Sequence, residues 1–313
     1  MRHAQEVTGY YFAHIKELTR EKQFHWASRL AAWTRDPRAF VLLRECRANI
    51  VPQPLTDEAL RTMFKALLGR RPGATARFPA FAERKPYFAK YPALFGAELA
   101  LFRLRHLGAA YGIDAREQFL QTMPISELEA LASELLDDPA ALSILSTFAI
   151  NFLYLLRRVV LHDDEGIDVE ALYNLGDRYD TSDDEQLRLM IYLYTHCIVA
   201  ESNFYQRPLP APLLPVYQRM LRRLEPLVQE HFMHCSLDTK LEFLVCCRIC
   251  NYQTPLFAQI DDECSQSLSP NGTFVVDTLN SFSRLKAKVS FASSEHRNAL
   301  YVMSSTPYRP AAR

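Results

Sequence analysis

Apolar residues recur at helical spacing from about residue 7 to residue 304, separated by short polar or proline-bearing joints. The longest such stretch runs from Leu187 to Arg207, between an acidic cap at 182–185 (Ser-Asp-Asp-Glu) and Pro208. Its middle is apolar nearly all round, which is typical of a buried central helix. An unpaired buried polar group costs roughly 1–3 kcal/mol. We therefore expect the polar residues of this helix to join neighbouring helices or to line a cavity.

The other apolar stretches predict an all-α fold. Further helices are expected within 7–33, 37–46, 56–68, 93–111, 114–122, 125–136, 139–161, 168–175, 212–231, 236–252, 255–268, 273–283 and 293–304. Pro226 should kink or end its helix. Only 273–276 and 288–291 could be strands, and both are short.

Prolines and arginines concentrate in residues 70–92, which predicts a basic loop or a boundary. It would separate an N-terminal helical segment or cap, 1–92, from a main helical domain, 93–313. Helices joined by brief connections tend to be antiparallel neighbours. The hairpins would form either a closed α/α toroid or an open solenoid, and the lack of a repeat period disfavours the solenoid.

Composition narrows the possible partners. The 313 residues carry 36 basic and 36 acidic side chains, and this neutrality argues against nucleic-acid binding. With 9 glycines and neither a GxGxxG nor a Walker motif, a glycine-rich phosphate loop is unlikely, and no cofactor is expected. The apolar run 142–161 is interrupted by polar residues and falls short of the ~20 residues that a membrane span needs. The seven cysteines and the lack of a signal peptide favour a cytoplasmic protein with reduced thiols.

Two short motifs carry a resemblance. The turn 269–274, followed by the helix start 293–303, resembles the closing turn of α/α-toroid proteins, and the segment 194–202 is similar to bacterial all-helical domains of unknown function. The resemblance covers only the C-terminal part of the chain and implies a toroid of bacterial type. The repeated Gly-x-Phe turns and aspartate-rich motif of terpene cyclases are missing, so it does not imply cyclase activity.

Candidate site residues lie on the central helix and on the last helix. His196 and Asn203 are seven residues apart and should share one face, with Glu201 and Tyr205 on another. Imidazole titrates near neutral pH, so His196 could act as an acid, base or ligand with Glu201 as its companion charge. In a toroid, the last helix could bring its own polar residues to the same cavity. The predicted catalytic residues are His196, Glu201 and His296; the predicted ligand-binding residues are Thr195, Asn203, Tyr205, Glu295 and Asn298. The alternative at each position is an ordinary packing or capping role.

Metal chemistry is a further alternative. His231, His234, Cys247 and Cys250 could bind zinc from two helices of a hairpin, although buried cysteines also serve as small apolar residues. Paired aspartates at 163–164 and elsewhere invite comparison with magnesium-dependent terpene synthases, but the DDxxD spacing is absent. The zinc hypothesis and the magnesium hypothesis are both less favoured than a site without a metal.

Two classes of function remain open. The first is a non-enzymatic helical module with a groove for a protein, a peptide or an apolar small molecule, in a specialised bacterial pathway. The second is an enzyme whose cavity gathers His196, Glu201 and His296. The abundance of aromatic residues, 19 Phe and 15 Tyr, and the lack of a coherent catalytic set favour the binding module.

Overall fold

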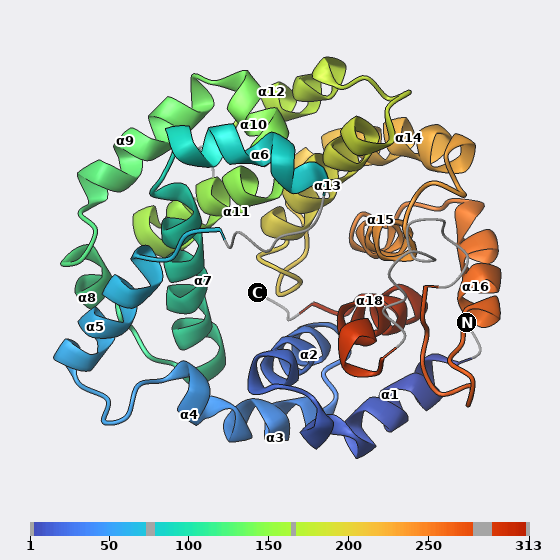
Figure 1. Ribbon diagram of the computed structural model, residues 1–313, viewed down its shortest axis with the longest axis horizontal. Coiled ribbons are helices and arrows are strands. Elements are labelled where there is room, and N and C mark those ends of the chain that lie inside the picture. Colours follow the sequence, from blue (N-terminus) through green and yellow to red (C-terminus); the bar gives the residue numbers. More distant parts are fainter. Residues whose placement is uncertain (1–2, 73–78, 164–166, 278–289, 311–313) are drawn as a thin grey trace. The chain divides into compact units, whose positions relative to one another are not determined.

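The computed structural model describes residues 3–72, 79–163, 167–277 and 290–310, and the prediction of an all-α fold is confirmed (Figure 1). Every regular element in these ranges is a helix, apart from one isolated antiparallel bridge between Leu268 and Val275. Of the two segments that could have been strands, 273–276 contributes only this bridge, and most of 288–291 lies outside the described residues.

The chain divides into two compact units, and the first is made of two separate pieces, residues 1–46 and 201–313. Its helices are α1 (Ala4–Ala13), η1 (Ile15–Glu17), α2 (Arg20–Trp33), α3 (Pro37–Glu45), η4 (Ala211–Leu213), α14 (Leu214–Glu230), α15 (Leu237–Ile249), α16 (Leu256–Gln266), η5 (Ala292–Ser294) and α18 (Glu295–Ser305). Within it, α18 packs against α1, α2 and α15. Trp26, Leu30 and Trp33 of α2 are wholly buried, which gives this unit much of its aromatic core.

The second unit is the continuous stretch 47–200. Its helices are α4 (Arg47–Ile50), α5 (Asp57–Leu68), α6 (Pro79–Lys90), α7 (Leu94–Tyr111), α8 (Arg116–Leu120), α9 (Ile125–Leu136), α10 (Pro139–Leu145), α11 (Thr147–Leu155), a π-helical segment (Leu156–Leu161), α12 (Val169–Asn174), η3 (Leu175–Arg178) and α13 (Asp184–Glu201), whose last residue belongs to the first unit. As predicted, most residues of α13 from Leu187 to Glu201 are buried.

Helices α5 and α7 come unusually close together in the second unit. The buried face of α5 consists of Leu60, Phe64 and Leu67, at helical spacing. On α7, a Cβ atom added at Gly96 would lie only 2.3 Å from the carbonyl oxygen of Leu68. Helix α5 precedes the predicted domain boundary at residue 92 and α7 follows it, so the two helices pack across that position. The boundary itself remains a prediction.

Three predicted features of the second unit are wrong. Residues 79–90 form α6 rather than a loop, because Arg84 donates to the carbonyl oxygen of Ile144 (3.0 Å) and Phe88 packs edge-on against Phe148. The single helix expected at 139–161 breaks at Ser146, where φ is 29° and α10 and α11 are bent by 104°. The central helix ends at Glu201, not at Arg207.

Two predicted helices of the first unit differ from the structure. Helix α14 continues through Pro226 to Glu230, with the buried Leu224 and Val228 on either side of the proline, so Pro226 does not end its helix; a kink there remains a prediction. Residues 273–277 are not helical, because Val276 donates its backbone N–H to Ser267, and the rest of that predicted helix lies outside the described residues.

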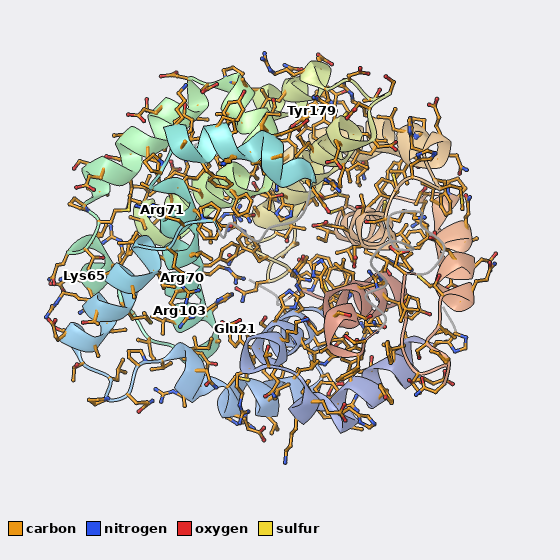
Figure 2. The ribbon with its side chains drawn as sticks, in the orientation of Figure 1. Glu21, Lys65, Arg70, Arg71, Arg103 and Tyr179 are labelled. Carbon is orange, nitrogen blue, oxygen red and sulfur yellow. The ribbon has the colours of Figure 1, made fainter. Side chains whose placement is uncertain are left out.

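The side chains around the end of α5 include basic residues that the sequence had placed in the predicted loop (Figure 2). Arg70 and Arg71 follow α5 and are exposed, whereas Arg103 of α7 donates to the carbonyl oxygen of Ile50 (2.9 Å). Within the described ranges, no single helix has the length and apolarity needed to cross a membrane; one bent pair, 139–145 with 147–161, passes that test by composition and length alone.

Candidate functional site

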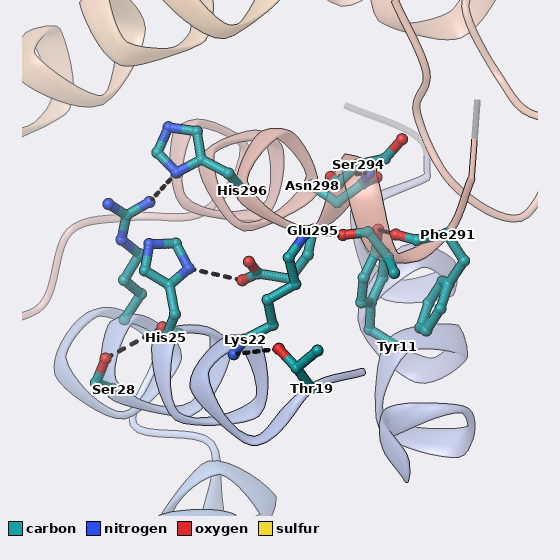
Figure 3. Close-up of polar contacts among 12 residues, drawn as sticks. Tyr11, Thr19, Lys22, His25, Ser28, Phe291, Ser294, Glu295, His296 and Asn298 are labelled. Atoms are coloured by element: carbon teal, nitrogen blue, oxygen red, sulfur yellow. Dashed lines mark hydrogen bonds and ion pairs between the residues drawn. The ribbon is translucent and has the colours of Figure 1, made fainter. Parts of the chain in front are cut away.

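The candidate site in the first unit is built from one face of α2 and the beginning of α18. His25 extends from α2 toward Glu295, the first residue of α18, and its Nδ1 lies 2.7 Å from Glu295 Oε1 (Figure 3). The Glu295 side chain is 3% exposed and that of His25 is 34% exposed. The buried carboxylate therefore fixes an imidazole that solvent still reaches.

A second imidazole lies beside the first. Arg29, one helical turn beyond His25, donates from Nη1 to Nδ1 of His296 (2.8 Å), so the proton of the neutral His296 ring is on Nε2. The ring centroids of His25 and His296 are 5.5 Å apart. Burial, and then the positive charge of Arg29, lower the pKa of His25 below its usual value, so His25 is neutral at pH 7.

The guanidinium of Arg29 also lies over an aromatic ring. Its central carbon is 5.8 Å from the centroid of Tyr205, and Tyr205 in turn packs edge-on against Trp33 at 5.9 Å. Within the described parts of the chain, no carboxylate forms an ion pair with Arg29. A half-buried cation with only neutral partners retains its attraction for an anion.

The turn that carries Tyr205 has an unusual backbone. After α13 ends at Glu201, Asn203, Phe204 and Tyr205 have φ values of 51°, 53° and 75°. The turn is held by the Ser202 hydroxyl, which accepts from the Tyr205 backbone N–H (2.9 Å). Left-handed conformations cost roughly 1–2 kcal/mol for each non-glycine residue. Asn203 and Tyr205 therefore lie on a strained turn and not on the helical faces predicted for them.

Glu201 and His196, predicted as companions, are held by different partners. The Glu201 carboxylate accepts from the hydroxyl of Tyr217 (3.0 Å) and lies 3.5 Å from Arg207, all in the first unit. His196 belongs to the second unit, where its Nδ1 lies 3.0 Å from Asn151 Oδ1. Since His196 and His296 lie in different units, their meeting in one cavity remains a prediction.

The second unit contains a chain of hydrogen bonds that includes His196. Asn151 of α11 is buried and donates to Glu98 Oε1 of α7 (3.1 Å), and its carbonyl oxygen faces His196 of α13. Burial raises the pKa of Glu98 to about 7. The three side chains thus connect three helices through hydrogen bonds, and the Asn151 carbonyl oxygen faces a protonated Nδ1 of His196.

Two predicted ligand-binding residues have structural partners. Asn298 is wholly buried, its carbonyl oxygen accepts from the Val275 backbone N–H, and its amide donates to the carbonyl oxygens of Val275 and Ser294, each at 2.8 Å. Thr195 is also wholly buried, and its hydroxyl donates to the carbonyl oxygen of Tyr192 (3.4 Å). We leave both residues out of the proposed site.

The predicted zinc ligands are distributed over two helix ends and a buried helix. The rings of His231 and His234 are 6.3 Å apart just after α14, and burial raises the pKa values of the Cys247 and Cys250 thiols, which disfavours the thiolates that zinc requires. Across the described ranges, no three His, Cys, Asp or Glu side chains are grouped so that they could hold a metal ion.

His25 and Arg29 were missed by the sequence analysis. Their spacing of four residues places them on one face of α2, and this was the available signal. What faces them is α18, about 270 residues later in the chain, and spacing alone does not reveal this partner.

Comparisons with protein-family models, with curated proteins and with solved structures found no match to this chain.

Proposed function

We propose that this chain is a non-enzymatic helical binding module that holds the acidic group of a small molecule or peptide in its first unit. The observation that carries the proposal is Arg29, a half-buried guanidinium flanked by neutral His296 and by the ring of Tyr205. Guanidinium groups bind carboxylate and phosphate through paired N–H donors. An acidic ligand would supply the opposite charge that Arg29 lacks among the described residues.

The proposal also includes three features expected from the sequence: antiparallel hairpins closed as an α/α toroid, a cytoplasmic location and a role in a specialised bacterial pathway. The apolar ligand expected from the aromatic content is replaced by an acidic one, because the polar residues gathered on α2 and α18 favour a charged group.

The test is a titration of the full chain with propionate and with inorganic phosphate, followed by isothermal titration calorimetry and by the NMR signals of the His25 and His296 rings. We expect saturable binding that Arg29→Met abolishes. Arg44→Met is the matched control, since it removes the same charge from an exposed position of α3 in the same unit. Binding that survives Arg29→Met, or no saturable binding of either anion, would refute the proposal.

An enzyme is the second candidate function. The observation that favours it is the series of hydrogen bonds from Glu98 through Asn151 to His196. A residue that fixes one nitrogen of an imidazole leaves the ring in a defined tautomer, as general bases require. Nitrogen-15 NMR should show the Nδ1–H tautomer for His196 in the wild type and a mixture in Asn151→Leu. Equal tautomer populations in both proteins would remove the support for an oriented base.

A further inference from the structure

His25 lies on the same face of α2 as Arg29, and its hydrogen-bonding properties restrict the class of ligand that the proposed site can bind. Arg29 offers a positive charge and donors, whereas His25 offers the nitrogen opposite its Nδ1. Because Glu295 is almost fully buried and lies 2.7 Å from Nδ1, that nitrogen carries the proton of the neutral ring. The remaining nitrogen, Nε2, then has a lone pair and can only accept a hydrogen bond.

The charged and titratable groups around His25 keep it in this state. On α2 these are Lys22 and Arg29, and on α18 they are Glu295 and His296. Burial and the two cations lower the pKa of His25, and Glu295 opposes this effect without overcoming it. At neutral pH the site therefore presents a cation and a hydrogen-bond acceptor one helical turn apart, about 5–6 Å between their Cβ atoms.

We propose that the site selects an anion that carries a hydroxyl donor beside its charged oxygens, such as a 2-hydroxycarboxylate or a protonated phosphate. The anionic oxygens would accept from Arg29, and the hydroxyl would donate to His25 Nε2. A plain carboxylate or a sulfate would satisfy Arg29 but would place acceptor oxygens against the lone pair of His25, which costs affinity. This inference rests on the proposed function, because it concerns the same Arg29 site.

The experiment uses two matched pairs of anions on the full chain at about pH 7.5, where His25 is neutral. Lactate is compared with propionate, and inorganic phosphate with sulfate. In each pair only the first anion has a hydroxyl donor. We expect one pair to show at least about tenfold tighter binding of its first member, which corresponds to one hydrogen bond. Preference within the first pair identifies a carboxylate ligand, and preference within the second identifies a phosphate group.

Two further measurements separate this inference from a general attraction for anions. His25→Phe removes the acceptor and keeps a ring of similar size, so the ratio within the selective pair should fall to about one while binding itself persists. Lowering the pH through the pKa of His25, followed by the NMR signals of its ring, protonates Nε2, so the same ratio should fall over that pH range in the wild type and stay unchanged in His25→Phe.

The outcomes distinguish the two levels of the argument. If none of the four anions binds, the proposed acidic-ligand site is refuted together with the inference. If both members of each pair bind equally, or if the preference survives His25→Phe, the inference is overturned and the acidic-ligand site stands. A preference lost in His25→Phe supports both.

Discussion

The close approach of α5 and α7 gives a sharp prediction for Gly96→Ala. The added methyl group would lie 2.3 Å from the carbonyl oxygen of Leu68, and 2.8 Å and 2.9 Å from its carbonyl carbon and Cα. All three are backbone atoms, so no side-chain rotation can relieve the overlap. The two helices must separate by about 1 Å to restore a contact near 3.5 Å.

The magnitude follows from two opposing contributions. Overpacking of this kind costs typically 1–3 kcal/mol, and a clash with backbone belongs at the upper end. Alanine favours a helix over glycine by about 1 kcal/mol. We therefore expect Gly96→Ala to lower the free energy of unfolding by about 2 kcal/mol.

Gly108 in the same helix is the matched control, since an added Cβ there meets nothing within 4 Å. Gly108→Ala should raise stability by up to about 1 kcal/mol through helix propensity alone. Both variants are measured by urea unfolding monitored by circular dichroism. A shift of the midpoint with an unchanged m-value reports the change in the free energy of unfolding. The packing argument is wrong if Gly96→Ala proves as stable as Gly108→Ala.

Three further predictions concern buried or strained groups. Burial raises the pKa of Glu98 to about 7, so its protonated form stabilises the folded state; this contribution, about 3–4 kcal/mol, is fully present below about pH 4 and is lost as the pH rises through about 7. In Glu98→Gln the urea midpoint should thus depend less on pH between about pH 5 and pH 8 than in the wild type, and parallel profiles would contradict this. At Asn203, where φ is 51°, the glycine variant should be more stable than the alanine variant by about 1 kcal/mol in thermal unfolding, and the reverse order would exclude backbone strain as the cause. Lys240 and Glu263 form a buried ion pair (2.5 Å), so Lys240→Met should cost about 3–5 kcal/mol and adding Glu263→Met should restore part of that loss; a double variant as unstable as the single one would refute this.

Helix spacing was enough to predict the all-α fold and the buried α13, because both depend on local apolar periodicity. It failed at the end of α13, where Asn203, Phe204 and Tyr205 adopt left-handed conformations; asparagine tolerates this conformation, but phenylalanine and tyrosine do not favour it. The Ser202 hydroxyl supports that turn, and a single serine in a sequence does not indicate such a role.

The candidate site was predicted only in part, for a different reason. Glu295 and His296 could be singled out because they begin a helix, and both lie in the proposed site. Their partners His25 and Arg29 lie on a helix at the opposite end of the chain, and pairing over such a distance is set by tertiary packing. Asn298 was predicted to bind a ligand, but its side chain makes hydrogen bonds with the backbone of Val275 instead.

The split of the first unit between residues 1–46 and 201–313 has a consequence for synthesis on the ribosome. The apolar side of α2, with Trp26 and Trp33, emerges long before α18, against which α2 packs. At roughly 5–20 residues per second, the separation of 267–270 residues between the paired side chains of α2 and α18 delays this burial by about 13–54 seconds. The continuous second unit is completed within that interval, whereas the nascent N-terminal helices expose tryptophans to chaperones. The residues of the proposed ligand site are thus joined only in the last stage of translation.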